Sequence, residues 1–201
     1  MRNHYAINKI PQEFYRFDAQ YQEGVKSSLR QRYSLLRYLY TCLYKSSRDG
    51  DPTIRHLMYD WPDLDQMVNN QDSFMIGKHI RVTANFDNST TPGKFQSYFP
   101  QGKWVDYTTY QVTQITDKVA LLDLYNGWSY TNVHVRSGSI VPFQDTSDTS
   151  NVKKTADLLT GKLKLLVVLS ETGYAEGLLY LSRGEIENEP YQYISITHSS
   201  K

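Results

Sequence analysis

The chain has 201 residues, with 22 Lys and Arg against 21 Asp and Glu and a formal net charge of +1. This balance gives no electrostatic case for binding nucleic acid or an anionic membrane surface. A hydrophobic content of 39%, with 17 Tyr, 7 Phe and 3 Trp, is enough for a folded core. The single cysteine, Cys42, excludes an intrachain disulfide and a zinc site built from several thiolates. No apolar run approaches the roughly 20 residues that a membrane-spanning helix needs.

The longest segment with a clear helical period is residues 18–48, which follow a loop-like stretch. Asp18 is the expected N-cap, because its carboxylate can accept from the free amides of the first turn. The Asp-Gly-Asp-Pro sequence at 49–52 is a stop signal. The apolar face of this helix is wide, which indicates contact with one large body and a second body beside it. Its members recur at three- and four-residue steps: Val25, Leu29, Tyr33, Leu36, Tyr40 and Leu43.

Beyond residue 53 the segments are short, rich in Val, Ile, Thr, Tyr and Phe, and separated by turn residues, as in an all-β sandwich. The polar, Ser/Thr-rich stretch 145–154 is interpreted as a linker between two β units. In the second unit, 162–170 is a buried strand with 177–181 as its hairpin partner, and 191–197 is a last strand with no visible partner after it. The strands expected in the first unit are 73–76, 80–84, 95–99, 105–107, 111–116, 119–124 and 133–135.

Familiar catalytic and cofactor signatures are absent from the sequence. It has no phosphate-binding glycine loop, no paired metal-ligand cysteines and no Gly-x-Ser-x-Gly elbow. The histidines are scattered at spacings that indicate no metal cluster, so each is expected to be a hydrogen-bonded structural residue. We therefore expect neither a metal site nor a cofactor.

Several ordered motifs along nearly the whole chain carry more information than any single one. They are Arg2-Asn3-His4 with Gln12-Glu13, residues 32–36 with 38–41, Phe74-Met75-Ile76-Gly77, Tyr98-Phe99-Pro100 with Gly102, Trp104 and Asp106-Tyr107, residues 133–142, and residues 165–169 with Gly173, Ala175, Gly177 and residues 179–181, ending at Gly184-Glu185. Together they closely resemble glycoside hydrolase family 31, the α-glucosidase family.

The resemblance implies a fold that is mainly β and is one part of a larger enzyme. Members of the family carry a (β/α)8 barrel followed by a proximal and a distal β-sandwich. Residues 1–52 would be the last loop and helix of the barrel, 53–145 the proximal β-sandwich, and 146–201 a truncated distal β-domain. The remaining barrel would be the missing segment against which this chain packs.

The family chemistry is a retaining double displacement by two carboxylates about 5 Å apart. The family places both aspartates on earlier barrel strands, and neither motif occurs in this sequence. We therefore expect the C-terminal portion of an α-glucosidase-like hydrolase that acts on an α-glucoside or maltooligosaccharide and is inactive alone. The alternative is a noncatalytic β-sandwich module that binds carbohydrate or a partner protein.

One substrate-contacting residue carries over from the family, namely His4. Its family counterpart hydrogen-bonds hydroxyls of the sugar in the cleaved subsite, which an imidazole N–H can do. Arg2 and Asn3 would support the loop that holds His4. No catalytic residue is expected among the 201 residues.

Departures from the family pattern carry further expectations. Arg37 stands where the family usually has proline, so the helix should be straighter. Ser182 and Arg183 replace an acidic pair, which puts any divalent-ion role of that turn in doubt. The Asn88-Ser89-Thr90 triplet is a glycosylation sequon, which favours a secretory or lysosomal location.

Overall fold

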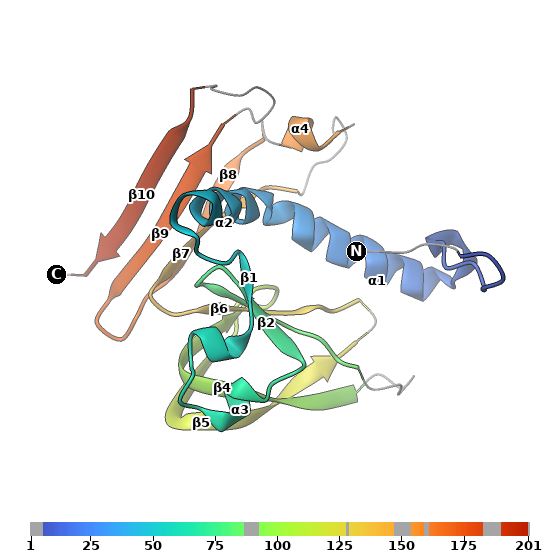
Figure 1. Ribbon diagram of the computed structural model, residues 1–201, viewed down its shortest axis with the longest axis horizontal. Coiled ribbons are helices and arrows are strands. Elements are labelled where there is room, and N and C mark those ends of the chain that lie inside the picture. The colour runs from blue at the N-terminus through green and yellow to red at the C-terminus, as the bar shows by residue number, and fades with distance from the viewer. Residues whose placement is uncertain are drawn as a thin grey trace.

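The computed structural model describes residues 6–86, 93–127, 129–146, 154–158, 161–182 and 190–200. The fold is mainly β, with two sheets and a pair of long helices (Figure 1). Helix α2 (Leu36–Asp49) lies across the four-stranded sheet, and α1 (Ala19–Ser34) extends away from both sheets after the short helix η1 (Phe14–Arg16). No helix in these ranges is both long and apolar enough to cross a membrane.

The first sheet has six strands in the order β1-β2-β3-β6-β4-β5. Two expected pairs of short strands prove to be single long strands. The Pro100–Gly102 stretch, predicted as a break, is a register shift inside β4, because a bulge bends a strand without ending it. The elements are β1 (Ile54–Arg55), η2 (Leu57–Tyr59), α3 (Asp65–Val68), β2 (Ser73–Ile76), β3 (Ile80–Thr83), β4 (Gly93–Asp106), β5 (Val112–Asn126) and β6 (Asn132–Arg136).

The second sheet has four strands in the order β10-β9-β7-β8. The predicted hairpin between 162–170 and 177–181 is wrong, because β7 lies between these strands and runs parallel to β9. The last strand, which has no visible partner after it in the sequence, pairs along its length with β9, which precedes it. The elements are β7 (Ser139–Gln144), α4 (Thr155–Leu158), β8 (Leu163–Val168), β9 (Tyr174–Leu181) and β10 (Gln192–Ser199).

Strand β7 was not among the strands expected from the sequence. It lies inside 53–145, yet all its sheet partners lie beyond residue 145. Strand β7 therefore lies before the expected boundary in the sequence but belongs to the sheet that follows it. The domain limits stay a prediction.

The helix expected over residues 18–48 is interrupted at Leu35, where φ is −91° and ψ is 5°. The prediction of one continuous helix is therefore wrong, although no proline is present. The Ser34 hydroxyl donates to the Gln31 carbonyl oxygen at 2.7 Å, a local bond that bends helices. Both ends agree with the sequence signals. Asp18 accepts from the Tyr21 N–H at 2.8 Å, and Gly50 ends α2 with a φ of 72°.

The N-cap provides a first test. Asp18→Ala should destabilise the first turn of α1 by about 1 kcal/mol, because the Tyr21 amide loses its acceptor. Amide hydrogen exchange of that turn should quicken about fivefold, whereas Asp18→Asn, which keeps an acceptor, should change it little. Equal exchange in both variants would contradict the cap.

Two apolar cores position the helices relative to the sheets. One lies within the first sheet and contains Leu57, Met67, Met75, Phe99, Trp104, Ile115 and Leu124. The other joins α2 to both sheets and contains Leu35, Tyr38, Ile80, Val105, Val133, Val135, Val141 and Val168. Helix α2 therefore contacts two bodies, as its wide apolar face predicted.

Candidate functional site

The residues proposed for the sugar site, Arg2, Asn3 and His4, lie outside the described residues, and so does the sequon at Asn88. The described part that follows them is the helical segment leading to the two sheets. Within this part, helix α2 makes polar contacts with both sheets, and these contacts form the candidate site.

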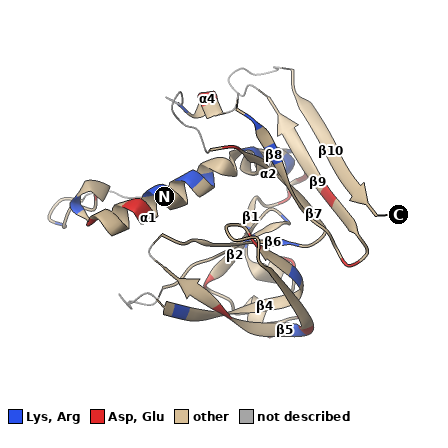
Figure 2. Cartoon of the chain, turned by 180° about the vertical axis from the view of Figure 1, so that it is seen from behind, with Lys and Arg blue, Asp and Glu red and all other residues tan. Residues whose placement is uncertain are grey.

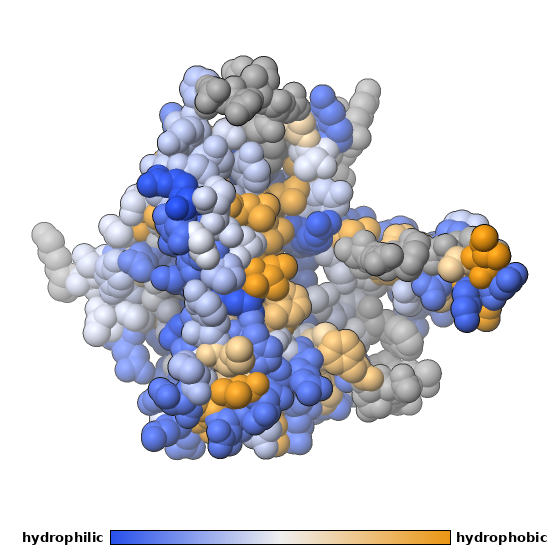
Figure 3. Space-filling model, viewed as in Figure 1, coloured by the Kyte–Doolittle hydropathy of each residue, from blue (hydrophilic) through white to orange (hydrophobic). Residues whose placement is uncertain are grey.

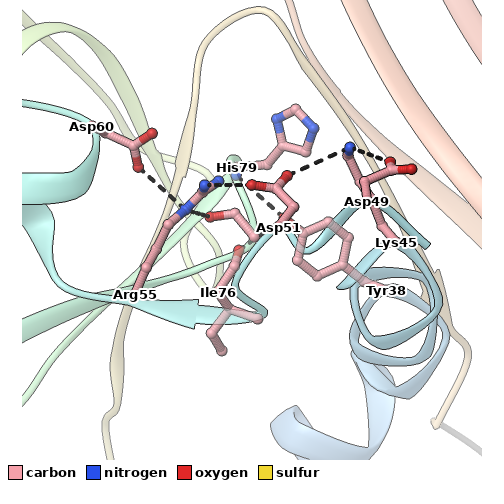
Figure 4. A network of polar contacts seen from close by, with 9 residues as sticks. Tyr38, Lys45, Asp49, Asp51, Arg55, Asp60, Ile76 and His79 are labelled. Atoms are coloured by element: carbon pink, nitrogen blue, oxygen red, sulfur yellow. Dashed lines mark hydrogen bonds and ion pairs between the residues drawn. The ribbon is translucent and has the colours of Figure 1, made fainter. Parts of the chain in front are cut away.

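Tyr38 connects α2 to the first sheet. Its side chain is buried in the shared core, and its hydroxyl lies between the end of β2 and the start of β3. The hydroxyl donates to the Ile76 carbonyl oxygen at 2.8 Å and accepts from the His79 backbone N–H at 3.2 Å. One side chain thus fills the core and holds the β2–β3 turn against the helix (Figure 4).

Thr41 connects the same helix to the second sheet. Its hydroxyl donates to the Arg37 carbonyl oxygen at 2.8 Å and accepts from the Tyr180 backbone N–H of β9 at 3.0 Å. Residues three apart share a helix face, so Tyr38 and Thr41 point the same way. Neighbouring hydroxyls on one face of α2 therefore bind different sheets.

Helix α1 is attached to the first sheet by serine hydroxyls. The Ser34 hydroxyl lies 2.8 Å from the Tyr107 hydroxyl, and Ser28 lies 2.8 Å from Thr131 Oγ1. Since Ser34 already donates to a helix carbonyl, Tyr107 is the donor in their shared bond. The break in the helix thus lies where it meets the sheet.

A charged network continues the junction past the end of α2 (Figure 4). Lys45 Nζ lies 2.9 Å from Asp49 and 3.5 Å from Asp51. Asp51 in turn lies 3.2 Å from Arg55 Nη1. The hydrogen bond from Lys45 to Asp49 raises the pKa of the lysine. The network therefore ties the helix end to β1.

Arg55 is the buried centre of this network, with its side chain 2% exposed. Its Nε donates to the Gly77 carbonyl oxygen at 3.0 Å and lies 3.4 Å from Asp60 Oδ2. Burial raises the pKa of Asp60, although the Arg55 charge opposes this shift. Removing the partners of a buried guanidinium strongly destabilises a fold, so the pairs with Asp51 and Asp60 mark Arg55 as a structural residue, although its Nη2 has no hydrogen-bond partner among the described residues.

Gly77 is required where α2 meets the β2–β3 turn. Its φ is +56°, and a Cβ there would lie 2.5 Å from Tyr38 Oη and 2.7 Å from Cys42 Sγ. Any other residue would have to push the helix away from the sheet. The Phe-Met-Ile-Gly motif therefore ends in glycine for a packing reason.

A cavity of about 160 Å³ lies beside this turn. Its wall includes His79, whose Nδ1 lies 2.7 Å from Ser139 Oγ on β7. Burial lowers the pKa of His79 to about 4 and raises the pKa of Cys42 to about 11. The other lining residues are Tyr38, Thr41, Lys45, Asp51, Pro52, Gly77, Lys78, Glu176, Gly177, Leu178 and Ser195.

At neutral pH these shifted pKa values set the protonation of two groups in the cavity wall. The thiol of Cys42 stays protonated and the imidazole of His79 stays neutral. In the described ranges, no group of three or more His, Cys, Asp and Glu could hold a metal ion. The junction thus joins α2 to both sheets.

A second buried charge lies within the first sheet. Arg81 is fully buried, and its guanidinium lies 3.7 Å from the centre of the Phe99 ring. Its Nη2 donates to the hydroxyls of Ser73 and Ser97 at 2.8 and 2.9 Å. Both hydroxyls also donate to Asp72, so the ion pair is relayed through serines. This centre joins β2, β3 and β4 and serves the fold.

Sequence reasoning missed the junction because its members come from separate segments. Tyr38 and Thr41 carry the one local signal, since two hydroxyl side chains share the apolar helix face. His79 gives no such signal, because its partner Ser139 lies 60 residues further along the chain. Arg55 pairs with Asp51 and Asp60, which are near it in the sequence, but its contact with the Gly77 carbonyl spans 22 residues. In Figure 2, basic and acidic residues are both scattered along the described helices and strands, and neither sign is confined to one part of the ribbon.

Comparison with known proteins places the junction at the boundary between two domain matches of one family. Residues 1–42 match the family model for the glycosyl hydrolases family 31 TIM-barrel domain. Residues 50–141 match the model for the glycosyl hydrolase family 31 C-terminal domain. Tyr38 and Thr41 thus lie in the first match, whereas Arg55, Gly77 and His79 lie in the second.

Curated relatives agree with both matches. A "Probable alpha/beta-glucosidase agdC" of Aspergillus clavatus is 33% identical over 187 residues, which cover 92% of this chain and 20% of that protein. The lysosomal alpha-glucosidase of Mus musculus is 29% identical over 221 residues, which cover 100% of this chain and 22% of that protein. The chain spans about a fifth of the length of these relatives.

Solved structures show the same fold. A glucosidase II alpha subunit superposes with a TM-score of 0.82 at 22% identity, covering 96% of this chain and 21% of that one. A family 31 alpha-glucosidase from Bacteroides thetaiotaomicron gives a TM-score of 0.73 at 22% identity, covering 100% and 29%. Two consecutive models of one family match in order, the first ending within α2 and the second beginning just after it. The chain therefore belongs to glycosyl hydrolase family 31, in the region where the TIM barrel meets the C-terminal domain.

Proposed function

We propose that this chain is the C-terminal portion of an α-glucosidase-like hydrolase that cleaves terminal α-linked glucose with retention of configuration. In this proposal it closes the barrel and braces it, and it has no activity alone. The observation that carries it is the order of the two family matches around α2, whose hydroxyls bind both sheets.

The surface of the barrel-matched segment supports this proposal. Ile7, Ile10 and Tyr15 are 85%, 81% and 76% exposed. They precede α1, and Figure 3 shows hydrophobic colour at the outer end of this helix. Exposed apolar side chains grouped in this way mark a surface that packs against another body. The remaining barrel is the body we propose for it.

His4 is the proposed substrate contact. Its ring N–H would hydrogen-bond a sugar hydroxyl in the cleaved subsite, and Arg2 and Asn3 would hold its loop. Such a bond orients the sugar and does not break the glycosidic bond. The proposed location in a secretory or lysosomal compartment rests on the family and on the Asn88 sequon.

The activity test compares the chain alone with a chimera in which it replaces the matching C-terminal region of the Aspergillus clavatus relative. We expect no turnover of nitrophenyl α-glucoside by the chain alone and hydrolysis by the chimera. Proton NMR of the first product should show α-glucose, as retention requires. Robust hydrolysis by the isolated chain would contradict the proposal, and so would a folded but inactive chimera.

The same chimera tests His4. His4→Ala should lower kcat/KM about 10- to 100-fold, the cost of a lost hydrogen bond to substrate. His198→Ala, a change at an exposed histidine on β10, is the matched control and should leave kcat/KM unchanged. Equal activity of the two variants would remove His4 from the site.

A further inference from the structure

A group of five tyrosines lies where α2 meets the edge of the second sheet. Tyr44 and Tyr180 are at its centre, with ring centroids 3.9 Å apart and an interplanar angle of 10°. They come from α2 and β9, so the stack joins helix and sheet. The whole group, called the tyrosine cluster below, is Tyr40, Tyr44, Tyr180, Tyr191 and Tyr193.

The outer members of the tyrosine cluster are held in place and still face solvent. Tyr191 and Tyr193 lie 5.5 and 5.3 Å from Tyr44, at interplanar angles of 51° and 52°. They are 53% and 39% exposed. Both rings are therefore packed against Tyr44 at a tilt, and part of each remains exposed as aromatic surface that a ligand could contact.

The spacing of these two rings follows from strand geometry. Tyr193 lies on β10, and Tyr191 comes two positions earlier, so both side chains project to the same side. Their backbone positions are about 7 Å apart at the usual rise per residue. Two neighbouring rings of an oligomeric ligand can each meet one tyrosine.

The polar atoms around the tyrosine cluster are mostly neutral. The Tyr40 hydroxyl lies 3.4 Å from Ser182 Oγ, and Arg48 Nη1 donates to the Tyr44 hydroxyl at 3.3 Å. Arg48 also lies 5.8 Å from the centre of the Tyr44 ring. Aromatic faces with hydroxyls at their edges suit a neutral polyol with an apolar C–H face and a rim of hydroxyl groups. A pyranose has this chemistry.

We propose that the tyrosine cluster is a binding site for an α-linked gluco-oligosaccharide, with Tyr191 and Tyr193 as stacking surfaces. The kind of sugar rests on the proposed function, whereas the place rests on the geometry of the cluster. Tyrosine is suited to such contacts because it presents a large amphipathic surface and loses little conformational entropy on binding. No reaction occurs at this site, and it holds the ligand through rings and hydroxyls.

The test measures binding of maltoheptaose to the full 201-residue chain by isothermal titration calorimetry, with cellopentaose as the comparison sugar. We expect saturable binding of maltoheptaose and weaker binding of cellopentaose. Tyr191→Ala and Tyr193→Ala should each raise Kd about tenfold, since each removes one stacking ring. Tyr191→Phe keeps the ring and should bind within about threefold of the natural chain.

The matched control is Tyr110→Ala, which removes a tyrosine 57% exposed on the first sheet and should leave Kd unchanged. Circular dichroism melts establish that each variant is folded. No maltoheptaose binding by the folded chain overturns the inference, and so does binding that the two alanine changes leave unaltered. Sedimentation that shows a dimer dispersed by Tyr191→Ala, without sugar binding, would assign the cluster to a protein contact instead.

This test separates the site from the proposed function. Loss of maltoheptaose binding in Tyr191→Ala upholds the site even if the chimera with the Aspergillus clavatus barrel is inactive. An active chimera whose chain shows no saturable binding overturns the site and leaves the proposed function standing.

Discussion

Replacing Tyr38 by alanine is expected to lower the free energy of unfolding by about 3–5 kcal/mol, the usual cost of removing a buried aromatic ring. The ring is 3% exposed in the core that joins α2 to both sheets. The change also leaves the Ile76 carbonyl and the His79 N–H without their shared partner. Urea unfolding followed by circular dichroism measures the loss.

Two further variants divide this loss between packing and hydrogen bonding. Tyr38→Phe keeps the ring and should cost about 1–3 kcal/mol, because two buried backbone groups become unsatisfied. Tyr15→Ala removes a tyrosine that is 76% exposed and should stay within about 0.5 kcal/mol of the natural chain. An alanine variant at position 38 as stable as the Tyr15 variant would show that α2 is not held by this side chain.

Acidification from pH 6.5 to pH 4 is expected to destabilise the chain through two buried histidines. Burial lowers the pKa of His134 and of His79 to about 4, below the ordinary value of 6.5. The unfolded chain therefore binds more protons in this interval, and the stability present above pH 6.5 is lost as the pH falls toward 4. The loss is about 2–3 kcal/mol for each histidine, at about 1.4 kcal/mol per pKa unit.

His134 is one of these two residues: it is 7% exposed and lies edge-on to Phe99, with ring centroids 5.0 Å apart. The Asp106 carboxylate lies 3.8 Å from His134 Nε2 and raises the pKa of His134, but burial lowers this pKa by more. Burial also opposes the charge on Asp106, but the hydrogen bond from Tyr130 contributes to a lowered pKa. Asp106 therefore loses its own stabilising contribution in acid as well.

Urea midpoints at pH 7 and pH 4.5 test the acid effect. His134→Gln should shrink the difference between the two midpoints, because the buried titrating group is gone. His198→Gln, at an exposed position of β10, should leave the difference unchanged. Identical pH profiles for all three chains would show that His134 does not couple folding to protons.

Helix ends could be predicted because their signals are local. The Asp18 carboxylate and the Gly50 backbone act within one turn, and both lie where the sequence placed them. The break at Leu35 could not be predicted in this way. It depends on a Ser34 hydroxyl that also contacts Tyr107, and Tyr107 is far along the chain.

Strand existence could be predicted better than strand pairing. Residues 73–76 match β2, because alternation and turn residues are local properties. The sheet partners of β7 could not be predicted from the sequence, because a parallel partner such as β9 lies beyond a crossover connection. Strands 163–168 and 174–181 are consecutive in the sequence, which favours a hairpin, but β7 lies between them in the sheet.

The sequence by itself determined the family, the mainly β character of the chain and the presence of a helix that must contact two bodies. These follow from motif order, periodicity and capping residues, which are properties of neighbours along the chain. Only the tertiary structure decided which hydroxyl of α2 binds which sheet, that Arg55 and His79 meet at that junction, and that five tyrosines gather beside it. The reason is that hydrogen bonds, ion pairs and ring contacts between distant segments depend on how the whole chain packs. Such packing produces no periodicity or motif among residues that are neighbours in the sequence.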